Sequence, residues 1–76
     1  MKFVIKVYDK EIDEWHTYIR SPSDFPEEKD AVVDALESHR EGIGKVIKPF
    51  TSLSNALSYL SHSHGLEVQC EHNYLI

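Results

Sequence analysis

The sequence predicts an α+β fold, a two-layer sandwich in which two helices cover one face of a mainly antiparallel four-stranded sheet. Apolar and polar residues alternate with a period of two at both ends of the chain, which is typical of half-buried strands. Two central segments instead carry apolar residues at helical spacing. The expected element order is β-β-α-β-α-β, and residues 1–76 are expected to form a single domain, because so short a chain can bury only one core.

The first two strands are "KFVIKVYD" and "EWHTYIR", joined by the polar turn "DKEID". Alternation places Phe3, Ile5 and Val7 on one face of the first strand, and we expect Trp15 and Ile19 of the second strand to join them in the core. The other face of this predicted hairpin would stay open. It would carry Val4, Lys6, Tyr8, His16, Tyr18 and Arg20.

The first helix is expected to start at Asp24 as N-cap, with Pro26 in its first turn, and to end at Gly42 and Gly44. A short third strand, "KVIKPF", follows at residues 45–50. Its proline lacks a backbone donor, so this strand should end there or lie at a sheet edge.

The second helix is expected over "TSLSNALSYLSHSHG", with Thr51 as its cap and Gly65 at its end. Its apolar residues lie on one side, while the other side is almost entirely serine and asparagine. That flat, uncharged side could contact a second copy of the chain, so a homodimer is one option. The last strand is expected over "LEVQCEHNYLI", residues 66–76.

The charge balance favours a protein partner over nucleic acid. Thirteen acidic residues face eight basic ones, and the formal net charge is −5, whereas a duplex-binding domain usually carries a basic stripe. We therefore expect a small acidic, non-enzymatic protein that binds a protein partner with a basic surface and regulates or inhibits it, by analogy of size and charge with phage-type and accessory inhibitors. The predicted partner-binding residues combine the acidic turn with the open face: Tyr8, Asp9, Glu11, Asp13, Glu14, His16, Tyr18 and Arg20.

A first alternative is a metal-binding domain, because "HSHGLEVQCEH" holds three histidines and the only cysteine. These are zinc-ligand types, and the candidate ligands are His62, His64, Cys70 and His72. The spacing opposes this reading, since two histidines separated by one residue on a helix point in nearly opposite directions. Histidines that favour a helix C-terminus and a buried apolar cysteine explain the same residues, so no cofactor is expected.

A second alternative is a single-stranded RNA platform, in which Tyr8 and Tyr18 on the open sheet stack bases. The negative net charge opposes it, because phosphate is repelled. Catalysis is not expected either, since a reactive cysteine needs an electropositive niche and Cys70 is flanked by Gln69 and Glu71.

The compartment predicted for this chain is the cytoplasm. One cysteine permits no internal disulfide, and small secreted domains usually carry several. The apolar run at the N-terminus is too short for a signal peptide. No stretch is long enough to span a bilayer, so we expect no membrane partner.

Overall fold

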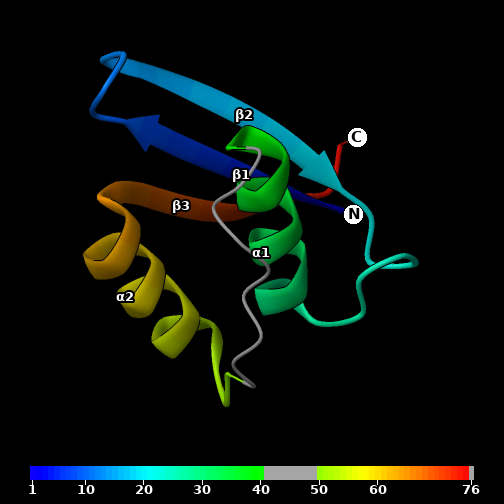
Figure 1. Ribbon diagram of the computed structural model, residues 1–76. Coiled ribbons are helices and arrows are strands. Elements are labelled where there is room, and N and C mark those ends of the chain that lie inside the picture. The colour runs from blue at the N-terminus through cyan, green and yellow to red at the C-terminus, as the bar shows by residue number, and fades with distance from the viewer. Residues whose placement is uncertain (41–49, 76) are drawn as a thin grey trace.

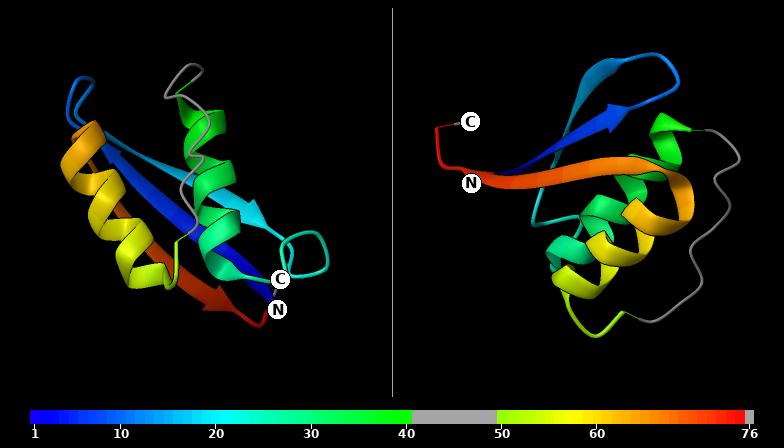
Figure 2. Two further views of the ribbon diagram at one scale, coloured as in Figure 1. Left: turned by 60° about the horizontal axis from the view of Figure 1, so that its bottom comes forward. Right: turned by 90° about the vertical axis from the view of Figure 1, so that its left-hand side faces the viewer.

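The computed structural model describes residues 1–40 and 50–75, which form a three-stranded sheet covered on one face by two helices (Figure 1). The strand order is β2-β1-β3, and both pairings are antiparallel. Two further views show both helices on the same side of the sheet (Figure 2). The elements in chain order are β1 (Lys2–Asp9), β2 (Glu14–Arg20), α1 (Glu28–His39), α2 (Leu53–His64) and β3 (Leu66–Asn73).

The prediction of a four-stranded sheet with the order β-β-α-β-α-β is wrong, because the described residues form three strands in the order β-β-α-α-β. The α+β character and the placement of both helices on one face agree with the prediction. Most of the predicted third strand, residues 45–50, lies outside the described residues, and Phe50 is not part of a strand. The predicted end of the first helix at Gly42 and Gly44 also lies outside them.

Helix α1 begins at Glu28, later than the predicted start at Asp24. The backbone N–H groups of Asp24 and Phe25 donate to the Ser21 carbonyl at 3.1 and 2.9 Å, so this segment is a separate turn. Pro26 explains the delay, because a proline disfavours helical backbone in the residue that precedes it.

Helix α2 and strand β3 differ from the prediction mainly at their ends. Ser52, not Thr51, is the N-cap, and its hydroxyl accepts from the Asn55 N–H at 3.2 Å. Thr51 instead accepts from the Asn55 side-chain amide at 2.8 Å. The predicted helix end is confirmed, since Gly65 adopts a left-handed φ of 63° that glycine tolerates best. Strand β3 ends at Asn73.

The core lies between the sheet and the two helices. The prediction that Phe3, Ile5 and Val7 face it is confirmed, since all three are buried. Helix α1 contributes Leu36 and helix α2 contributes Leu60, both fully buried. Burying one such side chain stabilises the fold by roughly 1.5–3 kcal/mol, so these contacts hold the helices on the sheet.

The faces of β2 are reversed relative to the prediction. Ile5 pairs with Tyr18 and Val7 pairs with His16, and directly opposed residues of an antiparallel pair lie on the same face. The polar residues of β2 therefore point towards the helices. The prediction that Trp15 and Ile19 join the core is wrong, because they are 50% and 47% exposed on the other face.

The length of the hairpin loop causes this reversal. Asp9 pairs with Glu14, which leaves four loop residues, and Asp13 adopts a left-handed φ of 51° within that loop. A shift of one residue in register exchanges the two faces of a strand. The turn therefore fixes the orientation of β2, although its apolar residues would fit the core.

Candidate functional site

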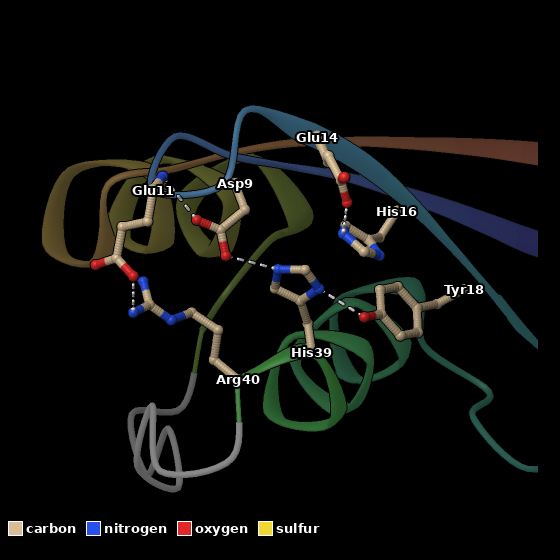
Figure 3. A network of polar contacts seen from close by, with 7 residues as sticks. All are labelled: Asp9, Glu11, Glu14, His16, Tyr18, His39 and Arg40. Atoms are coloured by element: carbon tan, nitrogen blue, oxygen red, sulfur yellow. Dashed lines mark hydrogen bonds and ion pairs between the residues drawn. The ribbon is translucent and has the colours of Figure 1, made fainter.

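A buried chain of hydrogen bonds joins the sheet to α1 through His39 (Figure 3). The Nε2 atom of His39 lies 3.0 Å from Oδ2 of Asp9, and its Nδ1 atom lies 2.6 Å from the Tyr18 hydroxyl. The side chains of His39 and Asp9 are only 4% and 8% exposed. The arrangement is satisfied when His39 donates through Nε2 to the Asp9 carboxylate and Tyr18 donates to Nδ1.

The ionised form of Asp9 is favoured in this chain of contacts. The hydrogen bond from His39 lowers the pKa of Asp9, burial opposes that shift, and the Glu11 backbone N–H, 3.0 Å from Oδ1, lowers the pKa further. The pKa of Tyr18 is raised, mainly by burial. The lowered pKa agrees with an ionised Asp9 that accepts a hydrogen bond from His39, and the raised pKa agrees with a neutral Tyr18 hydroxyl that donates one to His39.

His16 lies beside this chain, with its ring 4.8 Å from the His39 ring in an edge-on arrangement. Its buried Nε2 atom makes no hydrogen bond, although the Glu14 carboxylate lies 3.4 Å away. That distance is long for a charge-assisted hydrogen bond, so we regard the pair as a weak electrostatic contact.

Two arginines complete the layer of polar contacts. Arg20 donates from Nε to Asp34 at 2.8 Å and from Nη2 to Ser38 at 3.1 Å, both on α1. Arg40 donates to Glu11 of the hairpin loop at 2.7 Å. These contacts tie β2 and the hairpin loop to α1, and they offset the cost of turning polar residues towards the helices.

Five of the predicted partner-binding residues therefore serve the fold in this layer: Asp9, Glu11, His16, Tyr18 and Arg20. In this chain Asp9 and Tyr18 contact both ring nitrogens of His39, whose side chain is 4% exposed.

The opposite sheet face presents a strip of aromatic and aliphatic side chains, which we call the open face. The Tyr8 and Trp15 rings lie 5.4 Å apart and tilted, and Val4 and Ile19 are direct cross-strand partners. Neither described helix lies on this side (Figure 2). Ile12 in the hairpin loop is also exposed, at 53%.

Acidic groups surround this strip on two sides. Lys6 bridges to Glu71 at 3.1 Å, which leaves Glu67 as the other acid on the β3 side. Asp13 accepts from the Tyr8 hydroxyl and thereby positions that ring beside Trp15. At the hairpin end the acid beside the strip is Asp13, since Glu11 is bonded to Arg40 and Glu14 shares the helix-facing side of β2 with His16.

The predicted metal ligands are only partly brought together. Cys70 and His72 share the inner face of β3, and both contact the same carboxylate oxygen of Glu28, at 3.0 and 2.8 Å. Burial, with a smaller effect of Glu28, raises the pKa of Cys70 to about 12. A thiol with so high a pKa is a poor nucleophile, because nucleophilic attack needs the thiolate.

The other two predicted ligands lie on α2. His62 is bonded through Nδ1 to the Ser58 carbonyl at 2.8 Å. The side chain of His64 lies outside what the structure describes. Among the described residues, no group of three or more histidine, cysteine or acidic side chains is arranged to hold a metal ion.

Comparison with protein-family models, curated proteins and solved structures finds no match for this chain. Within residues 1–40 and 50–75, no helix has both the length and the apolar character needed to cross a membrane.

Sequence reasoning missed the position of Trp15 and Ile19 on the open face and the part played by His39. The length of the hairpin loop could have indicated the outward position of Trp15 and Ile19. A four-residue loop closed by Asp9 and Glu14 turns both side chains away from the helices. The signal for the part played by His39 was weaker: His39 occurs near the end of α1, a position that also suits a helix-terminal histidine.

Proposed function

We propose that this protein is a non-enzymatic binding module that docks a protein partner on the open face and thereby regulates or inhibits it. The observation that carries the proposal is the exposure of Trp15 and Ile19, each about half accessible, beside Tyr8 on a sheet face that neither described helix covers. Tryptophan and tyrosine are enriched at the centres of protein interfaces, and clustered exposed apolar residues often mark such sites.

The charges around the strip indicate the kind of partner. Asp13 and Glu67 flank the Tyr8–Trp15 pair, Lys6 on the central strand is paired with Glu71, and the chain carries a formal net charge of −5. A partner with an apolar contact area inside a basic rim would match both features. Complementary charges of this kind mainly increase the association rate.

The same geometry weakens the RNA alternative. Tyr18 and Arg20 face α1 and are bonded there, so of the predicted aromatic and basic residues only Tyr8 and Lys6 stay on the open face, and Lys6 is paired with Glu71. Tyr8 and Trp15 remain available for stacking, but the acids beside them would repel phosphate.

The test compares three tagged proteins expressed in the native source: wild type, a Trp15→Ser/Ile19→Ser double variant and a Thr17→Ser control on the same face. The proposal expects one partner retained by wild type and control and lost with the double variant. That partner, once purified, should bind the wild type with an affinity that the double variant lowers at least tenfold. Equal binding of all three proteins to every purified candidate would contradict the proposal.

The acidic rim is tested with the purified partner. Glu67→Lys should slow association and flatten its salt dependence, with little change in dissociation, whereas Asp13→Lys should slow association and also speed dissociation, because the Tyr8 hydroxyl loses its acceptor. Asp24→Lys in the exposed turn between β2 and α1 changes the charge by the same two units away from the open face and is the matched control. Association rates that are equal in all three variants would remove the rim from the binding surface.

A further inference from the structure

Strand β2 lies at the edge of the sheet, and its outer side is free of other strands among the described residues. The order β2-β1-β3 gives it one strand neighbour, and no other described element lies beyond it in Figure 1. The backbone N–H and C=O groups along such an edge can pair with another extended chain. Strand β2 (Glu14–Arg20) is regular over seven residues and contains no proline, so its outer backbone groups can pair along its length.

The sequence of β2 is complementary to itself when it is read in the antiparallel direction about Thr17. Glu14 then lies opposite Arg20 and Trp15 lies opposite Ile19, while Thr17 meets its own copy. Opposite charges, an aromatic residue with a β-branched one, and paired threonines are all favourable cross-strand combinations. The remaining pair, His16 with Tyr18, brings together two residues able to exchange a hydrogen bond.

We propose that two copies of this chain form a symmetric dimer by antiparallel pairing of their β2 edges about a two-fold axis at Thr17, which creates a continuous six-stranded sheet. This register uses all seven residues of β2, and each opposed pair lies on one sheet face. An antiparallel ladder contains two kinds of residue pair, and a two-fold axis can pass through either kind. An axis at Thr17 is therefore possible whether Thr17 forms a hydrogen-bonded or a non-hydrogen-bonded pair with its own copy.

Arg20 is already positioned beside this edge. Its Nη1 atom donates to the Ile19 carbonyl at 3.0 Å, while Nε and Nη2 bind Asp34 and Ser38 of α1. In the dimer the guanidinium can exchange its bond to the edge carbonyl for one to Glu14 of the second copy. Glu14 is the residue opposite it, and its only described contact is the weak one to His16.

The other sheet edge lacks this complementarity. Pairing of β3 with itself about Gln69 would place Glu67 opposite Glu71, and directly opposed like charges are destabilising. The two edges of the sheet are therefore not equivalent, and β2 is the one suited to a second copy.

Pairing through β2 would also join the two open faces. Trp15 of each copy would lie beside Ile19 of the other, so one apolar strip would cross the axis. The dimer does not rest on the proposed function, because it depends on the backbone edge and on the Glu14–Arg20 pair, whereas partner docking depends on the open face. Either can fail without the other.

The principal test is an exchange of charge, measured as mass in solution by light scattering and sedimentation equilibrium. Wild type should reach twice the 8.8 kDa mass of the chain as its concentration rises. Glu14→Arg and Arg20→Glu should each weaken the homodimer about tenfold, because both opposed pairs become repulsive. An equimolar mixture of the two variants should restore a dimer of wild-type affinity, since each pair is then complementary again.

Circular dichroism confirms that each variant is folded, and Glu27→Arg, which alters an acid outside the sheet, is the charge control. A wild type that stays at 8.8 kDa up to millimolar concentration would overturn the proposal. Equal dimerisation of wild type and both variants, or no recovery in the mixture of folded variants, would overturn it as well.

Disulfide trapping locates the axis independently of charge. In a Cys70→Ser background, Thr17→Cys should form an intermolecular disulfide under mild oxidation, because residues directly opposed across an antiparallel pair have Cα atoms within disulfide range. Ser54→Cys on α2 should stay monomeric. Equal rates of cross-linking for the two variants would contradict an axis at Thr17.

Discussion

The side chain of His39, at the end of α1, is held between the carboxylate of Asp9 and the hydroxyl of Tyr18, 3.0 Å from the first and 2.6 Å from the second. One ring therefore connects a helix to the last residue of β1 and to the middle of β2. The contact gives Tyr18, on the polar face of β2, a hydrogen-bond partner on the helix that covers that face. The outward position of Trp15 and Ile19 depends on it, because the two faces of a strand cannot be chosen separately.

His39→Ala should destabilise the protein and lower its thermal midpoint by several degrees, since the Asp9 carboxylate and the Tyr18 hydroxyl both lose a buried partner. His62→Ala, at an exposed position on α2, is the matched control and should change little. Thermal unfolding followed by circular dichroism makes the comparison. Equal midpoints for the two variants would show that the buried chain contributes no stability.

Stability should fall in acid through Asp9. Its folded-state pKa lies below the ordinary value of 3.8 because His39 donates to the carboxylate. A lowered folded-state pKa means that the stabilisation is present above the unfolded-state pKa and is lost as the pH falls through the folded-state one. Urea unfolding between pH 6 and pH 2 should therefore show a smaller loss in Asp9→Asn than in wild type or in Asp24→Asn, a control in the exposed turn. Parallel losses in all three would contradict this role for Asp9.

The Cys70 thiol should react slowly with a disulfide reagent in the folded protein. Its pKa of about 12, against the ordinary 9.0, reduces the thiolate fraction near pH 8 roughly a thousandfold. Glu28→Gln should accelerate the reaction by removing a carboxylate that raises that pKa, whereas Glu27→Gln should not. Rapid labelling of folded wild type, at the rate seen in urea, would show that the thiol is neither buried nor bonded as described.

The two faces of the hairpin should respond differently to the same truncation. Ile5 is fully buried, so Ile5→Ala should lower the free energy of unfolding by about 2–5 kcal/mol. Ile19 is 47% exposed, so Ile19→Ala should cost less than about 1 kcal/mol. Urea unfolding of both variants measures the difference. A larger loss for Ile19→Ala would mean that β2 has the opposite orientation.

The fold was predictable from sequence where pattern and local chemistry agree. Alternation in β1, Gly65 as the end of α2 and the burial of Phe3, Ile5 and Val7 all follow from short-range rules. The orientation of β2 does not, because its apolar residues suit a core while the hairpin loop imposes the other register. The hydrophobicity of the β2 residues therefore predicts the wrong inward face. The polar residues of β2 can face inward because they form hydrogen bonds with residues of α1, which are distant in the sequence.

The candidate site shows the same division. The acidic hairpin loop could be read directly from the sequence, but the partners of Tyr18 and Arg20 lie on α1, more than ten residues away. Contacts of that kind decide which side chains remain available for binding. Contacts with the helix layer occupy five of the predicted binding residues, whereas Trp15 is 50% exposed on the open face.

The most direct test of the account is the fluorescence of Trp15, the only tryptophan in the chain, measured at a concentration low enough to keep the protein monomeric. The orientation of β2 predicts an emission maximum close to that of the urea-unfolded chain and efficient quenching by acrylamide, because the side chain lies half exposed on the open face. A blue-shifted emission protected from acrylamide in the monomer would place Trp15 in the core and contradict the open face.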